Sequence, residues 1–208
     1  MSPLSPLASG ARVEFRLPGF HGGAIEGWHG IPESGHDTSI HVRPIEPDDF
    51  ERERAFVDGL SPRTAYQRLM SARRPSDEEL RRWTDIDRSH EGAMVATVFV
   101  DGLERQVGVA RYVMEGPDEE AEIAIVIADE WQGQGLGGRL LTALIDLARQ
   151  SGIRRLIGST LSENRGMLAL ARRFGFALSR QPGLAIITNL RLDLQAAPVR
   201  HRRAMWRP

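Results

Sequence analysis

A glycine-rich turn between a strand-like and a helix-like segment is the part of this sequence whose spacing most directly suggests chemistry. The apolar run 122–128 reads Glu-Ile-Ala-Ile-Val-Ile-Ala, and the turn 132–138 reads Gln-Gly-Gln-Gly-Leu-Gly-Gly. Apolar residues then recur at spacings of three and four, which predicts a helix; they are Leu140, Leu141, Leu144, Ile145 and Ala148. Glycines let a backbone approach a ligand closely, and free N–H groups at a helix start attract anions. The arrangement predicts a phosphate-binding site.

Two common phosphate-binding patterns fit this turn poorly. A Walker-type P-loop has Lys followed by Ser or Thr after its last glycine, whereas Arg139 and Leu140 stand here. The dinucleotide pattern matches the glycines at 133, 135 and 138, but it normally lies in the first βα unit and is followed by an acidic residue about 20 positions on. Residues 154–161 contain no carboxylate. The sequence therefore favours another phosphate ligand over a nicotinamide dinucleotide.

The turn resembles the pyrophosphate loop of the GNAT N-acetyltransferases, whose motif is Gln/Arg-x-x-Gly-x-Gly/Ala. A second motif follows at the expected distance, Glu163-Asn164-Arg165-Gly166-Met167 and then Arg173-Phe174-Gly175-Phe176. It is similar to the family's Asn-containing helix that leads into a Gly-Phe pair. The resemblance covers residues 39–194. It implies an α/β (α+β) GNAT fold, with a mixed, mostly antiparallel sheet that is split by the acyl-CoA cleft and has helices on both faces.

The same resemblance implies acetyl-CoA as co-substrate, with no metal. Backbone N–H groups of the strand would hold the pantetheine arm and the thioester oxygen, and the glycine turn would hold the diphosphate. Asn164 would contact the pantetheine arm and could cap its own helix as well. The expected cofactor-binding residues are Val126, Ile127, Ala128, Gln132, Gly133, Gln134, Gly135, Leu136, Gly137, Gly138 and Asn164.

Within the superfamily, several segments resemble the catalytic domain of bacterial Pat-type protein lysine acetyltransferases. They are residues 60–69 (Leu-Ser-Pro-Arg-Thr-Ala-Tyr-Gln-Arg-Leu), 76–80 (Ser-Asp-Glu-Glu-Leu), 85–87 (Asp-Ile-Asp) and 108–112 (Gly-Val-Ala-Arg-Tyr). Many such relatives carry an additional cyclic-nucleotide-binding or acyl-CoA-synthetase-like domain, for which these 208 residues leave no room. The resemblance implies a protein lysine as the acceptor amine.

Glu122 is the candidate catalytic base, because it is the one charged residue of the run 121–128 and lies next to the predicted cofactor loop. We expect partial burial there to make its carboxylate a stronger base. The resemblance supports this role, since Pat-type enzymes use a strand glutamate at this position. A solvent-facing residue at a frayed strand end is the alternative. Many GNAT enzymes have a Tyr general acid where this chain has Ala171, and Asp87 and His90 are secondary polar candidates that we expect to be structural.

Composition limits the alternatives. The net charge of −1 favours neither nucleic acid nor a membrane as partner. There is no cysteine, which excludes thiol catalysis, and all 27 basic residues other than histidine are Arg, so the chain has no lysine of its own to acetylate. Because no apolar run approaches ~18 residues and the start lacks a basic n-region, we expect a cytoplasmic protein.

The remaining pattern predicts one domain with two flanking segments. We expect a strand at 39–45 and helices starting at Pro47, at Ser61-Pro62 and at the Ser76–Glu79 capping box. Strands at 93–100 and 106–114 flank an Asp-Gly turn and should form a hairpin. A strand at 154–161, a helix at 163–174 and strands at 176–180 and 184–193 complete residues 39–194. Residues 1–38 form a Gly/Pro/His-rich arm that could pack on the domain or on a second copy in a homodimer, and residues 195–208 form a basic tail.

Three functions fit these observations. The first is an acetyl-CoA-dependent N-acetyltransferase that acts on protein lysine, and the second is the same chemistry on a small amine. The third is a non-catalytic acyl-CoA-binding module. Glu122 favours the first two, and the early helices, which in the family form a wall of the acceptor site, favour a protein acceptor.

Overall fold

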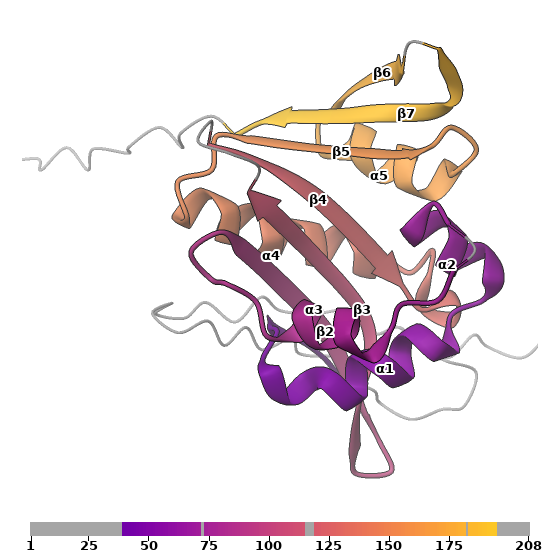
Figure 1. Ribbon diagram of the computed structural model, residues 1–208, viewed down its shortest axis with the longest axis vertical. Coiled ribbons are helices and arrows are strands. Elements are labelled where there is room, and N and C mark those ends of the chain that lie inside the picture. Colours follow the sequence, from indigo (N-terminus) through magenta and orange to yellow (C-terminus); the bar gives the residue numbers. More distant parts are fainter. Residues whose placement is uncertain (1–38, 72, 115–118, 182, 195–208) are drawn as a thin grey trace, which may run out of the picture.

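The chain folds around a seven-stranded sheet in the order β1-β2-β3-β4-β5-β7-β6, shown in Figure 1. The computed structural model describes residues 39–71, 73–114, 119–181 and 183–194, so the predicted arm 1–38 and tail 195–208 lie outside it. The strands are β1 Ile40–Pro44, β2 Glu91–Val100, β3 Leu103–Met114, β4 Glu120–Ile127, β5 Arg155–Leu161, β6 Ala177–Gln181 and β7 Leu184–Asp193. Among the strand pairs of the described residues, only β4–β5 is parallel. The predicted mostly antiparallel sheet is confirmed.

Five α-helices connect and cover these strands within the described residues. They are α1 Phe50–Gly59, α2 Pro62–Leu69, α3 Asp77–Thr84, α4 Leu136–Gln150 and α5 Arg165–Arg173, with short 3-10 turns η1 at Pro47–Asp49 and η2 at Asp129–Trp131. Helix α4 packs on one face of the sheet and α1 on the other, as Figure 1 shows. The predicted placement of helices on both faces is therefore confirmed.

Local sequence signals fix several boundaries. The Ser61 hydroxyl accepts the N–H of Thr64 at 3.2 Å and caps α2. Ser76 and Glu79 form a complete capping box at the start of α3. Asp101 and Gly102 both have positive φ, at 52° and 78°, which is the geometry of the predicted two-residue hairpin turn between β2 and β3.

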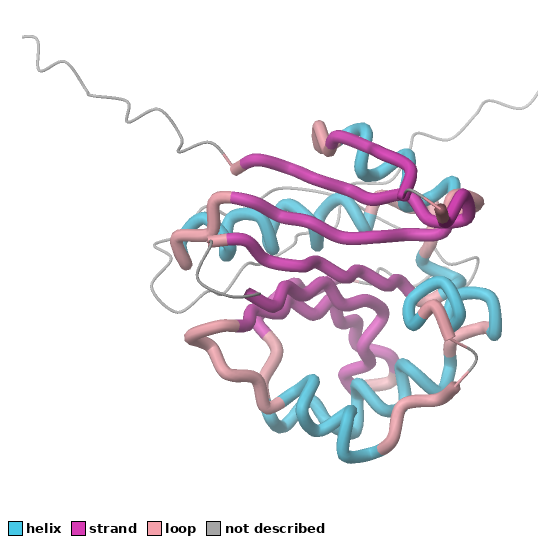
Figure 2. The backbone as a smooth tube through the Cα atoms, turned by 45° about the horizontal axis from the view of Figure 1, so that its top comes forward, coloured by secondary structure: helices cyan, strands magenta, loops and turns pink. Residues whose placement is uncertain are grey.

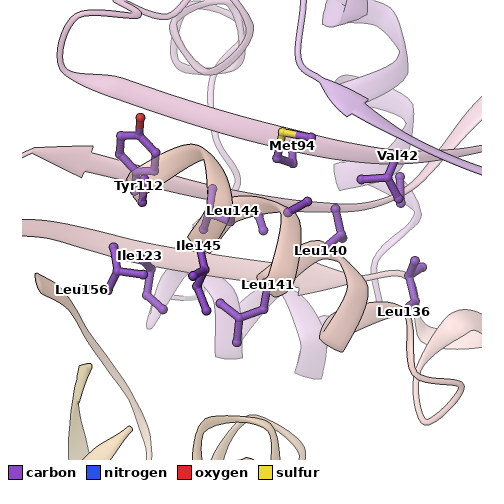
Figure 3. Packing of buried hydrophobic residues seen from close by; sticks show 14 of the residues in the cluster. Val42, Met94, Tyr112, Ile123, Leu136, Leu140, Leu141, Leu144, Ile145 and Leu156 are labelled. Atoms are coloured by element: carbon purple, nitrogen blue, oxygen red, sulfur yellow. The ribbon is translucent and has the colours of Figure 1, made fainter. Parts of the chain in front are cut away.

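The larger hydrophobic core lies between α4 and the sheet. The side chains of Leu140, Leu141 and Leu144 are fully buried against strand residues such as Met94 and Tyr112, and Figure 3 shows this packing. These leucines come from the three–four spacing that predicted the helix, which explains how α4 is held along β2, β3 and β4. The beginning of α4 is thereby fixed beside the end of β4.

A buried carboxylate holds β1 against the first helical segment. Asp49 is fully buried and accepts hydrogen bonds from Arg43 at 2.6 and 2.7 Å, from Arg52 at 2.6 Å and from the N–H of Glu46 at 2.8 Å. Burial opposes its ionisation, but the hydrogen bonds and charge of Arg43 outweigh this and lower the pKa of Asp49.

In the described part of the chain, no helix is long and apolar enough to cross a membrane.

Candidate functional site

The sheet opens between β4 and β5. Their parallel pairing covers only Glu120–Glu122 against Arg155–Ile157, after which the two strands diverge, as Figures 1 and 2 show. On its other side β4 stays paired with β3 along its length, from Ala121 to Ile127. Backbone groups of the second half of β4 therefore point into a gap where a neighbouring strand would otherwise lie.

The alternation of the ladder identifies which N–H groups of β4 face this gap. The N–H of Ala128 donates to the carbonyl of Val107 at 2.9 Å, so it faces β3 and is already used. Because N–H groups alternate sides along a regularly paired strand, Val126 also faces β3, whereas Ile125 and Ile127 face the gap. Of the amide donors predicted at residues 126–128, only the N–H of Ile127 faces the gap. The N–H of Ile125, which was not predicted, also faces it.

The first turn of α4 offers further N–H groups. Its N-cap is Gly135, with φ of +85°, and within the described residues no side chain caps this end. The N–H groups of Gly138 and Arg139 turn back to the Gly135 carbonyl at 3.1 and 3.3 Å, so those of Leu136 and Gly137 project beyond the helix start. Helix starts of this kind favour anions.

The backbone at this turn leaves room for a ligand. A Cβ placed on Gly133 or Gly135 would meet no atom within 4 Å, but both residues have a positive φ that L side chains rarely adopt. Glycine therefore keeps the turn in shape while its outer side stays open. These residues fit a bound diphosphate.

Two glutamines of the turn use their side chains inside the protein. The Gln132 amide donates to the Ile127 carbonyl at 3.0 Å and to the Thr64 hydroxyl at 3.2 Å, and the Gln134 amide donates to the Glu130 carbonyl at 2.6 Å. Gln132 thus satisfies a β4 carbonyl where β5 has departed. The Nε2 groups of both glutamines are therefore engaged within the protein.

A cavity of about 950 Å³ joins the turn to the gap in the sheet. Most of the predicted residues line it, namely Glu122, Val126, Ile127, Gln132, Gly133, Gly135, Gly137, Gly138 and Asn164. Ala128, Gln134 and Leu136 do not, and the Leu136 side chain is buried in the core. Asn164 is the N-cap of α5, because its Oδ1 accepts the N–H of Met167 at 3.0 Å.

Glu122 lines the cavity, but it is exposed, and the expectation of partial burial is wrong. Its side chain lies on the same face of the sheet as that of Val113, its partner on β3. The same face packs beneath α1 around Val126, but at Glu122 it opens into the cavity, which explains the exposure. The carboxylate is therefore accessible to a substrate from the cavity.

The secondary polar candidates stand apart from this cavity. Asp87 and His90 are exposed and bond to each other, with 3.0 Å between Oδ2 and Nδ1. Hydrogen bonds from Ser89 and His90 lower the pKa of Asp87 to about 2. Ala171, at the usual Tyr position, is fully buried and offers no hydroxyl.

The opposite wall contains a group of charged and aromatic residues that sequence reasoning missed. Trp83 of α3 has the guanidinium carbons of Arg68 and Arg111 at 5.4 and 5.2 Å from its ring centroid. Arg111 pairs with the buried Glu53 at 3.4 Å, and Glu53 also accepts the Gln106 amide. The sequence did contain a signal for this group, because Glu53 lies three residues from both Phe50 and Phe56 and so falls on the apolar side of α1.

Arg68 differs from Arg111 in having no ion-pair partner among the residues that the structure describes. Burial, and secondarily the like charge of Arg111, lower the pKa of Arg68 to about 10, while the charges of Glu53 and Glu122 oppose this. Even so, Arg68 is a cation at neutral pH. It faces the same cavity as Glu122.

Asp129 connects the two walls of the site. Its carboxylate accepts the N–H of Ser61 at 2.9 Å and the hydroxyls of Ser61 and Thr64, each at 2.7 Å. Although some burial opposes ionisation, these hydrogen bonds lower the pKa of Asp129. The segment that leads into the glycine turn is therefore bonded to the N-terminus of α2, the helix that carries Arg68.

Comparisons with known proteins agree with this geometry. Residues 61–176 match the acetyltransferase (GNAT) family. Acetyltransferase PA5475 of Pseudomonas aeruginosa is 36% identical over 160 residues, which is 76% of this chain and 86% of that protein. Acetyltransferase Pat of Mycolicibacterium smegmatis is 30% identical over 152 residues, 73% of this chain and 45% of that protein. The crystal structure of the GNAT domain of S. lividans PAT aligns with a TM-score of 0.66 at 28% identity, covering 74% of this chain and 89% of that domain.

The chain belongs to the GNAT acetyltransferase family, and its class of activity is N-acetyl transfer. The predicted resemblance to the Pat GNAT domain is confirmed in both sequence and fold. The match spans less than half the length of Pat itself. Among the described residues, no group of three or more His, Cys, Asp or Glu could hold a metal ion.

Proposed function

We propose that this chain acts in the cytoplasm and transfers the acetyl group of acetyl-CoA directly to a primary amine, with a protein lysine as acceptor. One observation carries the proposal: a single cavity joins the uncapped start of α4, the unpaired edge of β4 and Glu122. The resemblance of residues 60–69, 76–80, 85–87 and 108–112 to Pat-type protein lysine acetyltransferases supports the choice of a protein acceptor.

In this proposal the diphosphate lies at the glycine turn. The N–H groups of Leu136 and Gly137, together with the positive end of the α4 dipole, hold it. The pantetheine arm runs along β4 in the place of the missing strand and accepts hydrogen bonds from the N–H groups of Ile125 and Ile127. From Ile127 to Glu122 the strand rises roughly 16 Å at about 3.3 Å per residue. The acetyl group would thus be brought from the phosphate end toward Glu122.

The acceptor must lose a proton before it can react. A lysine with a pKa near 10.4 is neutral at pH 7 only once in about 10^3.4, which corresponds to about 4.6 kcal/mol. Glu122 takes this proton directly or through water, and a positioned base contributes ~10²–10⁴ in rate. Holding both reactants together contributes a further ~7–11 kcal/mol.

The transfer itself exchanges one bond for another. The amine nitrogen bonds to the thioester carbon, the carbon–sulfur bond breaks, and the sulfur leaves as thiolate. An N–H of Ile125 or Ile127 donates to the carbonyl oxygen as it gains negative charge. Because Ala171 has no donor, solvent or the substrate ammonium protonates the thiolate, which requires little help if the thiol pKa is near ~8.5.

A small-molecule amine is the second candidate acceptor. The L-methionine sulfoximine/L-methionine sulfone acetyltransferase of Pseudomonas aeruginosa is 33% identical to this chain over 103 residues, 48% of the chain. That relative's name describes a free amino-acid derivative as substrate. The match covers a smaller share of the chain than the match to Pat does, which favours the protein acceptor.

Thiol release tests the proposal directly. Because the chain has no cysteine, a thiol-reactive dye reports only the CoA that is produced. Because it has no lysine, acetyl-lysine detected by antibody or mass spectrometry comes only from the acceptor. We expect acetyl-CoA turnover with lysine peptides above that with simple small amines. Tight acetyl-CoA binding without turnover on any acceptor would contradict the proposal.

A further inference from the structure

The acceptor side of the cavity contains ionisable side chains of both signs that have no bonded partner in the described part of the chain. This acceptor side consists of the lining residues Arg68, Glu79, Arg82, Trp83, Glu91, Arg111, Val113 and Glu122. Two of its charges are neutralised, because Arg73 pairs with Glu79 at 2.8 Å and Glu53 pairs with Arg111. Within the described residues, Arg68, Arg82, Glu91 and Glu122 form neither a hydrogen bond nor an ion pair through their side chains.

Arg68 is the most constrained of these groups. It is half-buried on α2, and its guanidinium lies over Trp83, 5.4 Å from the ring centroid. Although it feels the charge of Glu122, no hydrogen bond joins the two side chains. Stacking on an aromatic face leaves the edge N–H groups of a guanidinium available, and their planar arrangement matches a carboxylate. Arg68 therefore presents donors to the cavity that the described protein groups do not satisfy.

We propose that the acceptor of this enzyme carries a carboxylate close to its reactive amine and that Arg68 binds this carboxylate. The inference rests on the proposed function and specifies its acceptor. Arg82, which is exposed at the rim of the same cavity, adds attraction for the anion, while Glu122 receives the ammonium. An amine without a neighbouring anion would leave Arg68 unpaired in a partly desolvated position, which is costly.

Two sources supply this chemistry, and the experiment separates them. One is an Asp or Glu side chain next to an acceptor lysine in a protein. The other is the α-carboxylate of a free amino acid. Two matched pairs of acceptors are compared by thiol release: a capped lysine peptide with Asp beside the lysine against the same peptide with Asn, and an amino acid against its C-terminal amide.

The wild-type chain should prefer the carboxylate in one of the two pairs. We expect kcat/KM to be about tenfold or more higher for the acidic member, mainly through a lower KM, because a charge-assisted hydrogen bond contributes to binding before and during reaction. A preference within the peptide pair identifies a protein acceptor, and one within the amino-acid pair identifies a small acceptor. Equal kcat/KM for both members of both pairs would overturn the inference while leaving the proposed function intact.

Variants of Arg68 assign the preference to this residue. R68Q should bring the ratio of acidic to neutral kcat/KM near one, and R68K should restore part of it. Using a ratio cancels any general loss of activity, and a calorimetric Kd for CoA checks that the variant is folded. The matched control is R63Q, an exposed Arg on the same helix that does not line this cavity, and it should keep the wild-type ratio. An unchanged ratio in R68Q would refute the role of Arg68. Absence of CoA release with every acceptor would instead refute the proposed function itself.

Discussion

Replacement of Glu122 by glutamine removes the proposed base and changes little else. The side chain is exposed in the cavity and, within the described residues, forms no hydrogen bond that folding would miss. A positioned base contributes ~10²–10⁴ in rate. Because water can reach an exposed position and replace the carboxylate in part, we expect a loss near the lower limit, ~10²-fold in kcat, or about 2.7 kcal/mol.

The pH dependence distinguishes a lost base from general damage. Without a base, the rate should follow the fraction of neutral amine, which rises tenfold per pH unit until the pH approaches the lysine pKa of about 10.4. Glu122→Gln should therefore recover toward the wild-type rate as the pH is raised from 7 to 9. Calorimetry should give an acetyl-CoA Kd within about twofold of wild type.

The matched control is Glu120→Gln, which makes the same change two residues earlier on the same face of β4. Glu120 pairs with Arg155 at 3.0 Å and does not line the cavity, so turnover should be unaffected. A Glu122→Gln variant with near-normal rates from pH 6 to 9 would refute the reasoning. So would an equal loss in both variants.

Three further predictions follow from the loop, its link to α2 and the buried carboxylate of η1. Gly135→Ala should weaken acetyl-CoA binding about tenfold, because it strains an N-cap at φ +85°. The control Gly152→Ala, at φ +78° beyond the other end of α4, should lower stability only. Equal calorimetric Kd values for acetyl-CoA in the two variants would argue against a diphosphate at this turn. Asp129→Asn should raise the acceptor KM roughly fivefold, about 1 kcal/mol, because it loosens α2, with little change in the Kd for acetyl-CoA. The control Glu130→Gln, at the exposed neighbouring residue, should behave as wild type. An unchanged acceptor KM in Asp129→Asn would show that Asp129 does not position α2 for the acceptor. Asp49→Asn should lower the free energy of unfolding in urea by about 3–5 kcal/mol at pH 7. Because folding lowers the pKa of Asp49, its contribution to the free energy of unfolding is complete above the unfolded pKa of about 3.9 and is lost as the pH falls below that value. The difference in unfolding free energy between Asp49→Asn and wild type should therefore shrink in acid, and a difference independent of pH would contradict this. The control Asp48→Asn should change stability little.

Local features were predictable from the sequence because their causes are local. The caps at Ser61 and Ser76 and the Asp101-Gly102 turn depend on residues within a few positions of one another, and all three are confirmed. The start of α4 was placed to within a turn by its glycines and leucines. The family motifs likewise stand in continuous segments.

The missed features depend on pairing between distant segments. Asp129 bonds to residues 68 and 65 positions away, and Arg111 to Glu53, 58 positions away, so their partners could not be inferred from spacing. The direction of the Ile125 and Ile127 N–H groups depends on the register with β3. The exposure of Glu122 depends on how far α1 covers its face of the sheet. These are properties of the assembled sheet.

The central claim is that a CoA diphosphate binds the first turn of α4 while the thioester lies along β4. A crystal structure of the chain with acetyl-CoA tests it most directly. We expect the diphosphate within hydrogen-bond distance of the Leu136 and Gly137 nitrogens, and the acyl group between Ile127 and Glu122. Density for the nucleotide elsewhere on the chain, or a pantetheine arm that avoids the gap between β4 and β5, would contradict the account.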